Sequence, residues 1–331
     1  ETHPTLSPDD PFADFETWDD GNITLTTAKE PKMLPTEYAR SALGLGLAHR
    51  EKLGINPFDF GMIGSSDIHT ALTTTEEDNY FGKFIHDGPA AGRTELKMAG
   101  QLQKIWRMVS SGLAGVWSTH NTREAIFDAM LRKEVYATTG SRIRVRFFAG
   151  WDFDEAALQD SQWTQKGYAQ GVPMGGQLPA TQDTDLAPAF MIKAQKDPNA
   201  AHLDRIQIIK GWLDDDGNSQ EQVYDVVASG ARTRNPVTGL FEPIKDTTDL
   251  TTATYSNTEG SPNLEGLWRD PDFDFAQAAF YYVRVLEIPT PRWTTFDAVR
   301  FKEKRADGDT GKLQERAYTS AVWYYPSGNG Q

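Results

Sequence analysis

The chain has 331 residues, of which 38% are hydrophobic and 11% aromatic, and its formal net charge at pH 7 is −14. This length suits two domains of roughly 150 residues each, and the apolar content excludes a disordered chain. The negative charge disfavours nucleic acid and anionic membrane surfaces as partners, and no apolar run approaches the roughly 18 residues of a membrane span. Because there are no cysteines, a transition-metal site must use His, Asp and Glu.

The first part of the chain alternates helical and strand patterns after a long loop over 4–35. The apolar spacing predicts a helix over 36–53, with Thr36 as its N-cap, followed by a buried strand over 58–64. Further along come a helix in KMAGQLQKIWRMVSSG, a strand in LAGVWST, a helix in REAIFDAMLRKE that Asn121 caps, and strands in EVYATTG and RIRVRFFAG. This alternation predicts a mainly parallel sheet or a β/α barrel.

From about Trp151 the pattern becomes rich in strands. The segments RIQIIKGWL and QEQVYDVV flank DDDGNS and predict a hairpin, in which Asp214–Asn218 are more typical of the turn than of a calcium loop. The remaining strand patterns are AFMIKAQ, AFYYVRVLEI and AYTSAVWYY. We therefore expect an α/β domain over 1–145 and an antiparallel β-sandwich-like domain over 146–331.

The segment GMIGSSDIHT is a candidate catalytic element. Asp67 and His69 follow a predicted strand, and residues i and i+2 of an extended segment point to the same side. A carboxylate and an imidazole suit zinc, manganese or iron, and Ser65 and Ser66 are placed to hydrogen-bond such ligands. The alternative is an Asx-type turn, because D-x-H is short and frequent by chance.

The other five histidines fall into three groups: a further candidate metal ligand, candidate substrate contacts, and packing or surface positions. Glu1 and His3 repeat the spacing of acid and imidazole, so they are further candidate metal ligands. His86 lies in a loop near the predicted site and His120 at a strand end, and both are candidate substrate contacts together with Ser66. His49 and His202 are more typical of packing or surface positions.

Several long blocks carry a family resemblance. They are ETHPTLSPDDPFA, YARSALGLGL, NPFDFGMIGSSDIHT, GVWSTHNTREAIFDAMLRKEVYATTGSRIRVRFFAGWDF and AFYYVRVLEIPTPRW. From Glu1 to about Tyr325 the chain resembles the bacterial family of unknown function DUF3604, whose relatives are the polymerase-and-histidinol-phosphatase (PHP) metallohydrolases. The resemblance implies a distorted β/α barrel with a centre of two or three metal ions, whose ligands are an early H-x-H, intermediate His and Glu residues, and a late D-x-H.

Asp67 and His69 match that late D-x-H, and His3 and Glu1 fall where intermediate ligands occur. The early H-x-H is absent, so the chain resembles the C-terminal half of a family member, and its N-terminal half is expected as a partner. The resemblance implies a metal-dependent hydrolase of a phosphoester or related ester or amide, active when full-length, with this fragment alone inactive. Bound zinc or manganese would lower the pKa of a water from about 15.7 to about 7.

Some alternatives stay open at the level of the sequence. Arg142 either pairs with an anionic leaving group, as a catalytic residue, or forms a salt bridge at the domain junction. Trp268 and the nearby acids Asp270, Asp272 and Asp274 indicate either a carbohydrate or calcium site or an ordinary loop.

The rival function is a non-catalytic module that binds a glycan or a protein on a degenerate PHP-like scaffold, and a third possibility is a natural subunit. The expected ligand of the enzyme is a small-molecule substrate. The sequence leaves its identity, the metal, the oligomeric state and a periplasmic or cytoplasmic location open.

Overall fold

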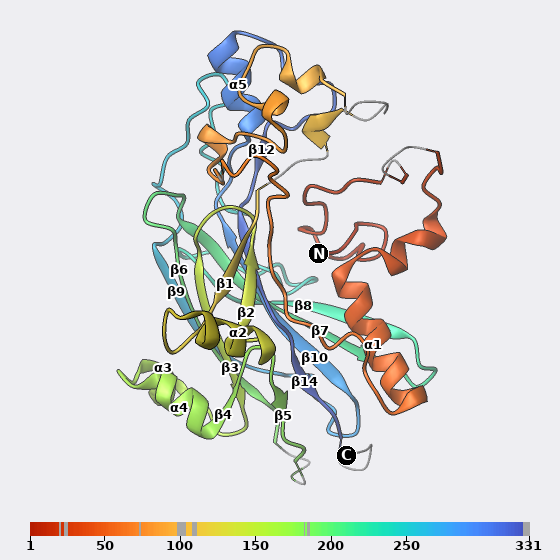
Figure 1. Ribbon diagram of the computed structural model, residues 1–331. Coiled ribbons are helices and arrows are strands. Elements are labelled where there is room, and N and C mark those ends of the chain that lie inside the picture. The colour runs from red at the N-terminus through yellow and green to blue at the C-terminus, as the bar shows by residue number, and fades with distance from the viewer. Residues whose placement is uncertain are drawn as a thin grey trace.

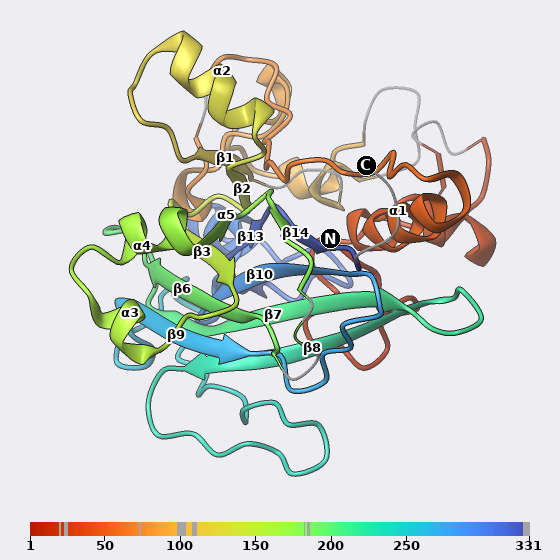
Figure 2. The ribbon, with the colours of Figure 1, turned by 90° about the horizontal axis from the view of Figure 1, so that it is seen from below.

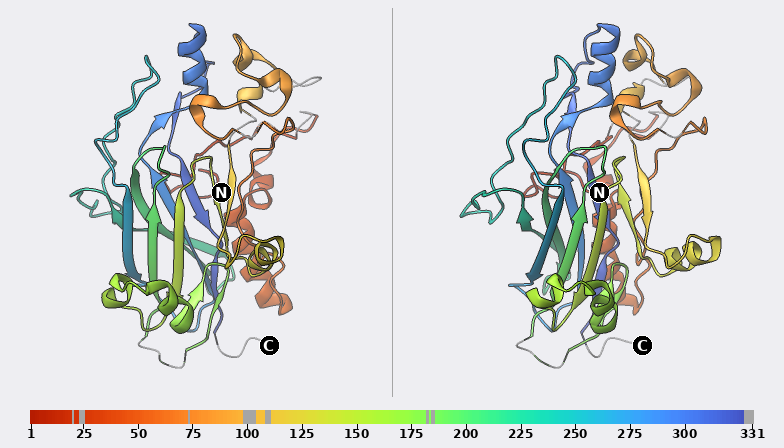
Figure 3. Two further views of the ribbon diagram at one scale, coloured as in Figure 1. Left: turned by 60° about the vertical axis from the view of Figure 1, so that its left-hand side comes forward. Right: turned by 90° about the vertical axis from the view of Figure 1, so that its left-hand side faces the viewer.

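The computed structural model describes residues 1–19, 21–22, 26–72, 74–97, 104–107, 111–181, 183 and 186–326. Two β-sheets pack face to face, and helices cover the outer face of each (Figure 1). In the right-hand side view the strands are seen side by side, and helix α2 (Arg123–Leu131) projects away from the sheets (Figure 3). Among the described residues, no helix is both long enough and apolar enough to cross a bilayer.

The larger sheet has eight strands, and the long strand β10 (Ala279–Glu287) is central to it. One edge of β10 pairs with β7, which forms the predicted hairpin with β8, and the other pairs with β13 and β14. Its remaining strands are β7 (Leu203–Leu213), β8 (Ser219–Ala228), β13 (Arg316–Thr319), β14 (Val322–Tyr324), β2 (Val135–Thr138), β1 (Leu113–Val116) and β5 (Gln177–Leu178). All its pairs are antiparallel except β5 with β14.

The smaller sheet has four antiparallel strands in the order β4-β3-β6-β9. They are β4 (Gly171–Pro173), β3 (Arg144–Gly150), β6 (Ala189–Gln195) and β9 (Asn263–Arg269). A separate pair joins β11 (Thr290–Pro291) to β12 (Lys312–Leu313). Seen from below, the strands of both sheets lie in layers, and the segment between β8 and β9 forms a wide loop beside them (Figure 2).

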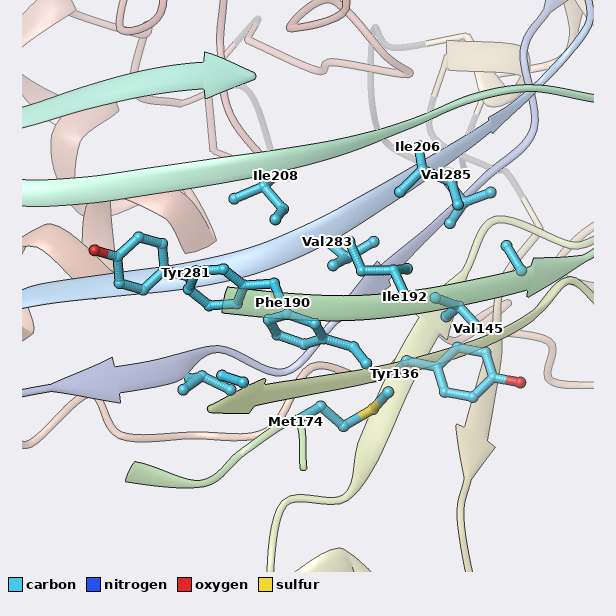
Figure 4. Packing of buried hydrophobic residues seen from close by; sticks show 14 of the residues in the cluster. Tyr136, Val145, Met174, Phe190, Ile192, Ile206, Ile208, Tyr281, Val283 and Val285 are labelled. Carbon is cyan, nitrogen blue, oxygen red and sulfur yellow. The ribbon is translucent and has the colours of Figure 1, made fainter. Parts of the chain in front are cut away.

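Apolar side chains that point inward from the two sheets form a core between them. Phe190 and Ile192 of β6 face Ile208 of β7 and Val283 of β10, and all four are fully buried (Figure 4). Because successive side chains of a strand point to opposite faces, their neighbours pack against the helices instead. The continuous apolar runs in the sequence therefore reflect sheets that are covered on both faces.

Helices α1 (Ala39–Leu53), α3 (Glu155–Gln159) and α4 (Trp163–Gln170) form the outer layers. Leu43 and Leu47 of α1 pack on the larger sheet, and Leu158 and Trp163 pack on the smaller one. The predicted helix 36–53 is found, but its N-cap is Tyr38, because Thr36 ends a 3₁₀ helix over Pro31–Thr36. The left-handed Gly54 ends α1 (φ 77°), a conformation that glycine adopts without strain.

The prediction of a mainly parallel sheet in the first part of the chain was wrong. Residues 58–64 are extended but form no strand, since only the amide of Gly64 bonds to a strand backbone, at 3.1 Å from the Leu113 oxygen. Strands β1 and β2 pair antiparallel, because α2 between them lies mostly in solvent and does not cross over the sheet. Its N-cap is Thr122, whose hydroxyl accepts the amide of Ala125, and not Asn121.

The mixed α/β and β-rich composition is confirmed, but the described residues contain no closed barrel. The larger sheet takes β1 and β2 from the first predicted domain and its other strands from the second. The division at residue 145 stays a prediction. The helix expected in KMAGQLQKIWRMVSSG lies partly outside the described residues, and its described part includes a 3₁₀ turn over Ile105–Arg107.

A helix near the C-terminal end of the chain, α5 (Trp293–Phe301), anchors an irregular region that the sequence left unassigned. Tyr80 and Ile105 of this region form a small buried cluster with Trp293 of α5. The region also contains 3₁₀ turns over Glu77–Asn79, Ile85–Asp87 and Arg93–Glu95. It lies beside α5, at the end of the sheets opposite α3 and α4 (Figure 1).

Candidate functional site

The side chains of Asp67 and His69 converge. Nε2 of His69 lies 3.0 Å from Oδ1 of Asp67, and the two side chains are 50% and 65% exposed, respectively. Asp67 has a left-handed backbone (φ 51°), which Asp tolerates better than most residues. The hydroxyl of Ser65 accepts the amide of Asp67 at 3.4 Å. The pair is therefore open to solvent at the end of an extended segment.

Lys83 and Phe84 complete the surroundings of this pair. Nζ of Lys83 lies 2.5 Å from Oδ2 of Asp67, and the backbone oxygen of Lys83 accepts the amide of His69 at 2.8 Å. The hydrogen bond from Lys83 lowers the pKa of Asp67, so its carboxyl stays ionised at neutral pH. The ring of Phe84 lies between two imidazoles, with its centroid 4.7 Å from His69 and 5.5 Å from His86.

Buried contacts hold the segment that carries Lys83 and His86. Arg93 donates to the backbone oxygens of Tyr80 at 2.9 Å and Asp87 at 2.8 Å, and its Nε pairs with Asp297 of α5. Its guanidinium also lies over the ring of Trp293, 4.3 Å from the centroid. These contacts fix the loop against α5, so the positions of Lys83 and His86 do not depend on the loop backbone alone.

Glu1 and His3 belong to other groups of side chains. The carboxyl of Glu1 binds Arg40 and the hydroxyl of Tyr282, and its second oxygen lies 3.1 Å from Arg284. Asp10 bridges the same two arginines at 2.7 to 2.9 Å. Burial raises the pKa of Glu1, but the two guanidinium groups outweigh it and hold that pKa well below its ordinary value. This buried network ties the N-terminal segment to α1 and β10.

Of the other predicted site residues, Ser66 lies next to the Asp67–His69 pair, and His3, His120 and Arg142 lie apart from it. Nε2 of His3 pairs with Asp19 at 2.5 Å, and the exposed His120 bonds to Thr119 at 3.0 Å. Arg142 forms a salt bridge with Glu76 at 2.9 Å and lies 3.6 Å from Asp197, while Ser66 is half-buried beside Asp67. The structure thus brings Asp67, His69, the adjacent Ser66 and, through Phe84, His86 together, and leaves the others elsewhere.

The donor set at the pair is incomplete for a metal ion. Asp67 and His69 supply one carboxylate and one imidazole that already converge, which is the chemistry zinc, manganese and iron accept. In the part of the chain that the structure describes, no group of three His, Asp, Glu or Cys side chains is placed to hold an ion. A metal bound here needs further ligands beyond these two residues.

A second group of side chains, which the sequence did not indicate, lines a cavity of about 330 Å³ that we call the acid pocket. Its carboxyls come from distant parts of the chain, namely Glu76, Glu77, Asp78, Asp197, Glu287 and Glu315. Ser141 donates its hydroxyl to Oε1 of Glu287, and Thr139 donates to Glu315. The one signal in the sequence was a carboxylate at the end of the apolar run AFYYVRVLE.

Burial dominates the electrostatics of the acid pocket. It raises the pKa of Glu287 to about 8, with Asp197 adding to the shift and Ser141 opposing it. It also raises the pKa of Glu315 well above its ordinary value, and that of Glu77 to about 7. These glutamates thus hold their protons at pH values where an exposed carboxyl is ionised.

The comparison with protein families decides the relationship of the chain. The family model described as "Protein of unknown function (DUF3604)" matches residues 1–326. The chain belongs to the DUF3604 family. No curated protein and no solved structure matches it. The resemblance to DUF3604 is thereby confirmed, whereas the relationship to PHP metallohydrolases and the match to a C-terminal half stay predictions.

In this DUF3604 protein, Trp268 and Asp270 make contacts within the chain. Trp268 lies in β9, with its ring 5.4 Å from that of Phe190 and 4.9 Å from that of Tyr224. Asp270 accepts from Tyr281 at 2.7 Å and pairs with Lys210 at 2.8 Å. The described contacts thus use this tryptophan and this acid within the protein.

Proposed function

We propose that this DUF3604 protein is a metal-dependent hydrolase of the PHP type, acting on a phosphoester or a related ester or amide of a small molecule. Asp67 and His69 are then two ligands of a divalent zinc, manganese or iron ion. The observation that supports this is their geometry, since the imidazole and the carboxylate approach to 3.0 Å in an exposed position after an extended segment.

In this proposal the metal ion takes its remaining ligands from residues other than the described side chains. This accounts for a site with two convergent donors and no third one among the described residues. The two residues alone do not form a complete metal site, so we derive no catalytic step from a metal here.

The electrostatics agree with a role for Asp67 as a ligand. A carboxylate must be ionised to bind a cation, and the hydrogen bond from Lys83 favours that form. The same ammonium group lies 2.5 Å from Oδ2, whereas Oδ1 lies 3.0 Å from Nε2 of His69. A metal ion at this pair would therefore replace the Asp67–His69 hydrogen bond and leave the Lys83 contact in place.

Metal analysis of the complete gene product tests the proposal. We expect bound zinc, manganese or iron, and a loss of at least half of that metal in Asp67→Ala and His69→Ala. Asp216→Ala, in the exposed β7–β8 turn, is the matched control and keeps the metal. Unchanged metal in both site variants would reject the assignment and favour the non-catalytic binding module.

A second experiment on the same protein tests the hydrolase activity. A panel of chromogenic phosphate, phosphonate, sulfate and carboxylic ester substrates, with each metal added in turn, should reveal hydrolysis of at least one class. That hydrolysis should be lost in the two site variants and kept in Asp216→Ala. Hydrolysis that survives both site variants would place the reaction elsewhere.

A further inference from the structure

The acid pocket contains buried polar atoms that lack a partner within the described part of the chain. Glu287 is 1% exposed, and its Oε2 has no hydrogen-bond partner there. Thr75 is 3% exposed, and its Oγ1 has none either. Both residues line the cavity. A buried oxygen without a partner loses its hydration and gains nothing in return, so these two atoms point to a ligand.

Carboxyl groups outnumber cationic groups in the described lining of the pocket. Neither Glu287 nor Glu315 forms an ion pair with a Lys or Arg among the described residues. Two cations lie near the pocket. Nζ of Lys196 donates to three backbone oxygens at 2.6 to 3.1 Å, and Arg142 pairs with the lining residues Glu76 at 2.9 Å and Asp197 at 3.6 Å, so neither cation pairs with Glu287 or Glu315. The pocket thus presents hydrogen-bond acceptors and space for a positive charge.

Aromatic and apolar residues form the rest of the wall. Tyr255 and Phe296 line the cavity, as do Ala201 and Pro291. Burial raises the pKa of the Tyr255 hydroxyl, and the carboxyls of Glu287, Asp78 and Asp197 add to the shift. An aromatic face attracts an organic cation, and an apolar wall accommodates its carbon chain.

We propose that the acid pocket binds a small organic cation with N–H donors, an alkylammonium or an alkylguanidinium group, through Glu287, Glu315 and Thr75. The N–H groups donate to the carboxyl oxygens and to Oγ1 of Thr75, and the carbon chain lies against Tyr255 and Phe296. A bare metal ion fits less well, because no three carboxylates among the described residues converge on one point. This inference stands without the proposed hydrolase function.

Binding of the cation releases a proton. Glu287 loses its carboxyl proton to solvent when the cation binds, and the positive charge of the ligand then balances the carboxylate. An alkylammonium group stays charged up to about pH 10, so only the pocket titrates. The groups that face Glu287 and set its ionisation are Glu315, Asp197, Lys196, Ser141, Tyr255 and, next to Glu315, Glu77.

The test is a titration of the protein with butylammonium, butylguanidinium, 1-butanol and tetramethylammonium, followed by calorimetry and by amide NMR shifts. We expect the first two to bind at least about tenfold more tightly than the neutral and the N–H-free probes, with the shifts centred on Thr75, Ser141 and Tyr255. The affinity should rise by up to about 50-fold from pH 6 to pH 8, following a carboxyl whose pKa is about 8.

Variants separate this role from a structural one. Glu287→Gln keeps the shape and the acceptor for Ser141 but cannot take a negative charge, so it should weaken butylammonium binding at least about tenfold and make its pH dependence shallower, because Glu77 and Glu315 still titrate. Thr75→Val should weaken binding of the same probe, and the exposed Glu124→Gln is the control that leaves it unchanged. Thermal unfolding checks that each variant is folded.

Three outcomes would overturn the inference. One is equal binding of 1-butanol and butylammonium, another is the absence of binding by either N–H cation at millimolar concentration, and the third is butylammonium binding that Glu287→Gln leaves intact. Failure of the hydrolase proposal shows in the metal content of Asp67 and His69 variants, so the two failures are distinguishable.

Discussion

Ser141, in the loop between β2 and β3, donates its hydroxyl to Oε1 of Glu287, the last residue of β10. This bond joins two segments that are 146 positions apart in the sequence. Glu287 is buried without a cationic partner among the described residues, so folding removes a carboxyl from water without neutralising it. The energetic consequence depends on pH.

The first prediction concerns stability against pH. The pKa of Glu287 is about 8 in the folded protein and near 4.5 in the unfolded chain, so the folded state binds the extra proton between these values. The free energy of unfolding should therefore fall as pH rises from roughly 5 to 8, by up to about 1.4 kcal/mol per pH unit from this group. Glu77 and Glu315 act in the same direction.

Urea unfolding of Glu287→Gln at several pH values measures this contribution. The variant should be more stable than the natural protein at pH 8 and should show a shallower fall, and the exposed Glu124→Gln should show the natural slope. An identical slope in Glu287→Gln and the natural protein would mean that Glu287 does not hold the proton.

The second prediction concerns the buried network of Asp10. Burial raises the pKa of Asp10, but Arg284 and Arg40 outweigh it and keep that pKa below the ordinary 3.8. Asp10→Asn leaves two buried guanidinium groups short of one carboxylate, which should cost about 3 to 5 kcal/mol of unfolding free energy. The neighbouring exposed Asp9→Asn should change it by less than about 0.5 kcal/mol. The effect should fade only below the folded pKa of Asp10, in strong acid.

The third prediction concerns the loop that carries Lys83 and His86. Arg93→Met removes the pair with Asp297 and the bonds to the backbone of Tyr80 and Asp87. We expect faster hydrogen exchange over residues 80–95, while the central strand β10 stays protected. Lys104→Met, which breaks only the exposed pair with Glu95, is the control. Equal exchange in the Arg93 variant and the natural protein would show that α5 does not hold this loop.

The fourth prediction concerns Lys83 and Asp67. Because the hydrogen bond from Lys83 is the largest cause of the lowered pKa of Asp67, Lys83→Met should raise that pKa toward 3.8. A carboxyl carbon NMR titration measures it directly, with Lys52→Met on the exposed end of α1 as the control. An unchanged pKa of Asp67 in Lys83→Met would show that the two side chains do not interact in solution.

The sequence predicted the elements that depend only on residues close together in the chain. The hairpin of β7 and β8 follows from the apolar runs of 203–213 and 219–228 around an Asp-rich turn, and α1 follows from its helical spacing. The antiparallel pairing of β1 with β2 could not be read in this way, because it depends on where α2 packs. Helix α5 was missed because Trp293, Thr294 and Thr295, residues typical of strands, begin it and are buried there.

The Asp67–His69 pair and the acid pocket also differ in how far apart their residues lie in the sequence. Asp67 and His69 are neighbours in sequence, so their spacing could suggest that they meet. The acid pocket gathers Thr75, Ser141, Asp197, Tyr255 and Glu287 through tertiary packing, and no window of the sequence contains them together. The buried pairing of Glu1 with Arg40 and Arg284 was equally invisible, since it joins the N-terminal segment to a central strand.

The most direct test of the metal site is imidazole nitrogen NMR of the six histidines during a titration with Zn²⁺. We expect the Nε2 signal of His69 to shift with the first bound equivalent, the signals of His49 and His202 to stay unchanged, and the His69 shift to disappear in Asp67→Ala but not in Asp216→Ala. A His69 signal that Zn²⁺ leaves unchanged, or one that shifts equally in Asp67→Ala, would contradict the assignment of this pair as metal ligands.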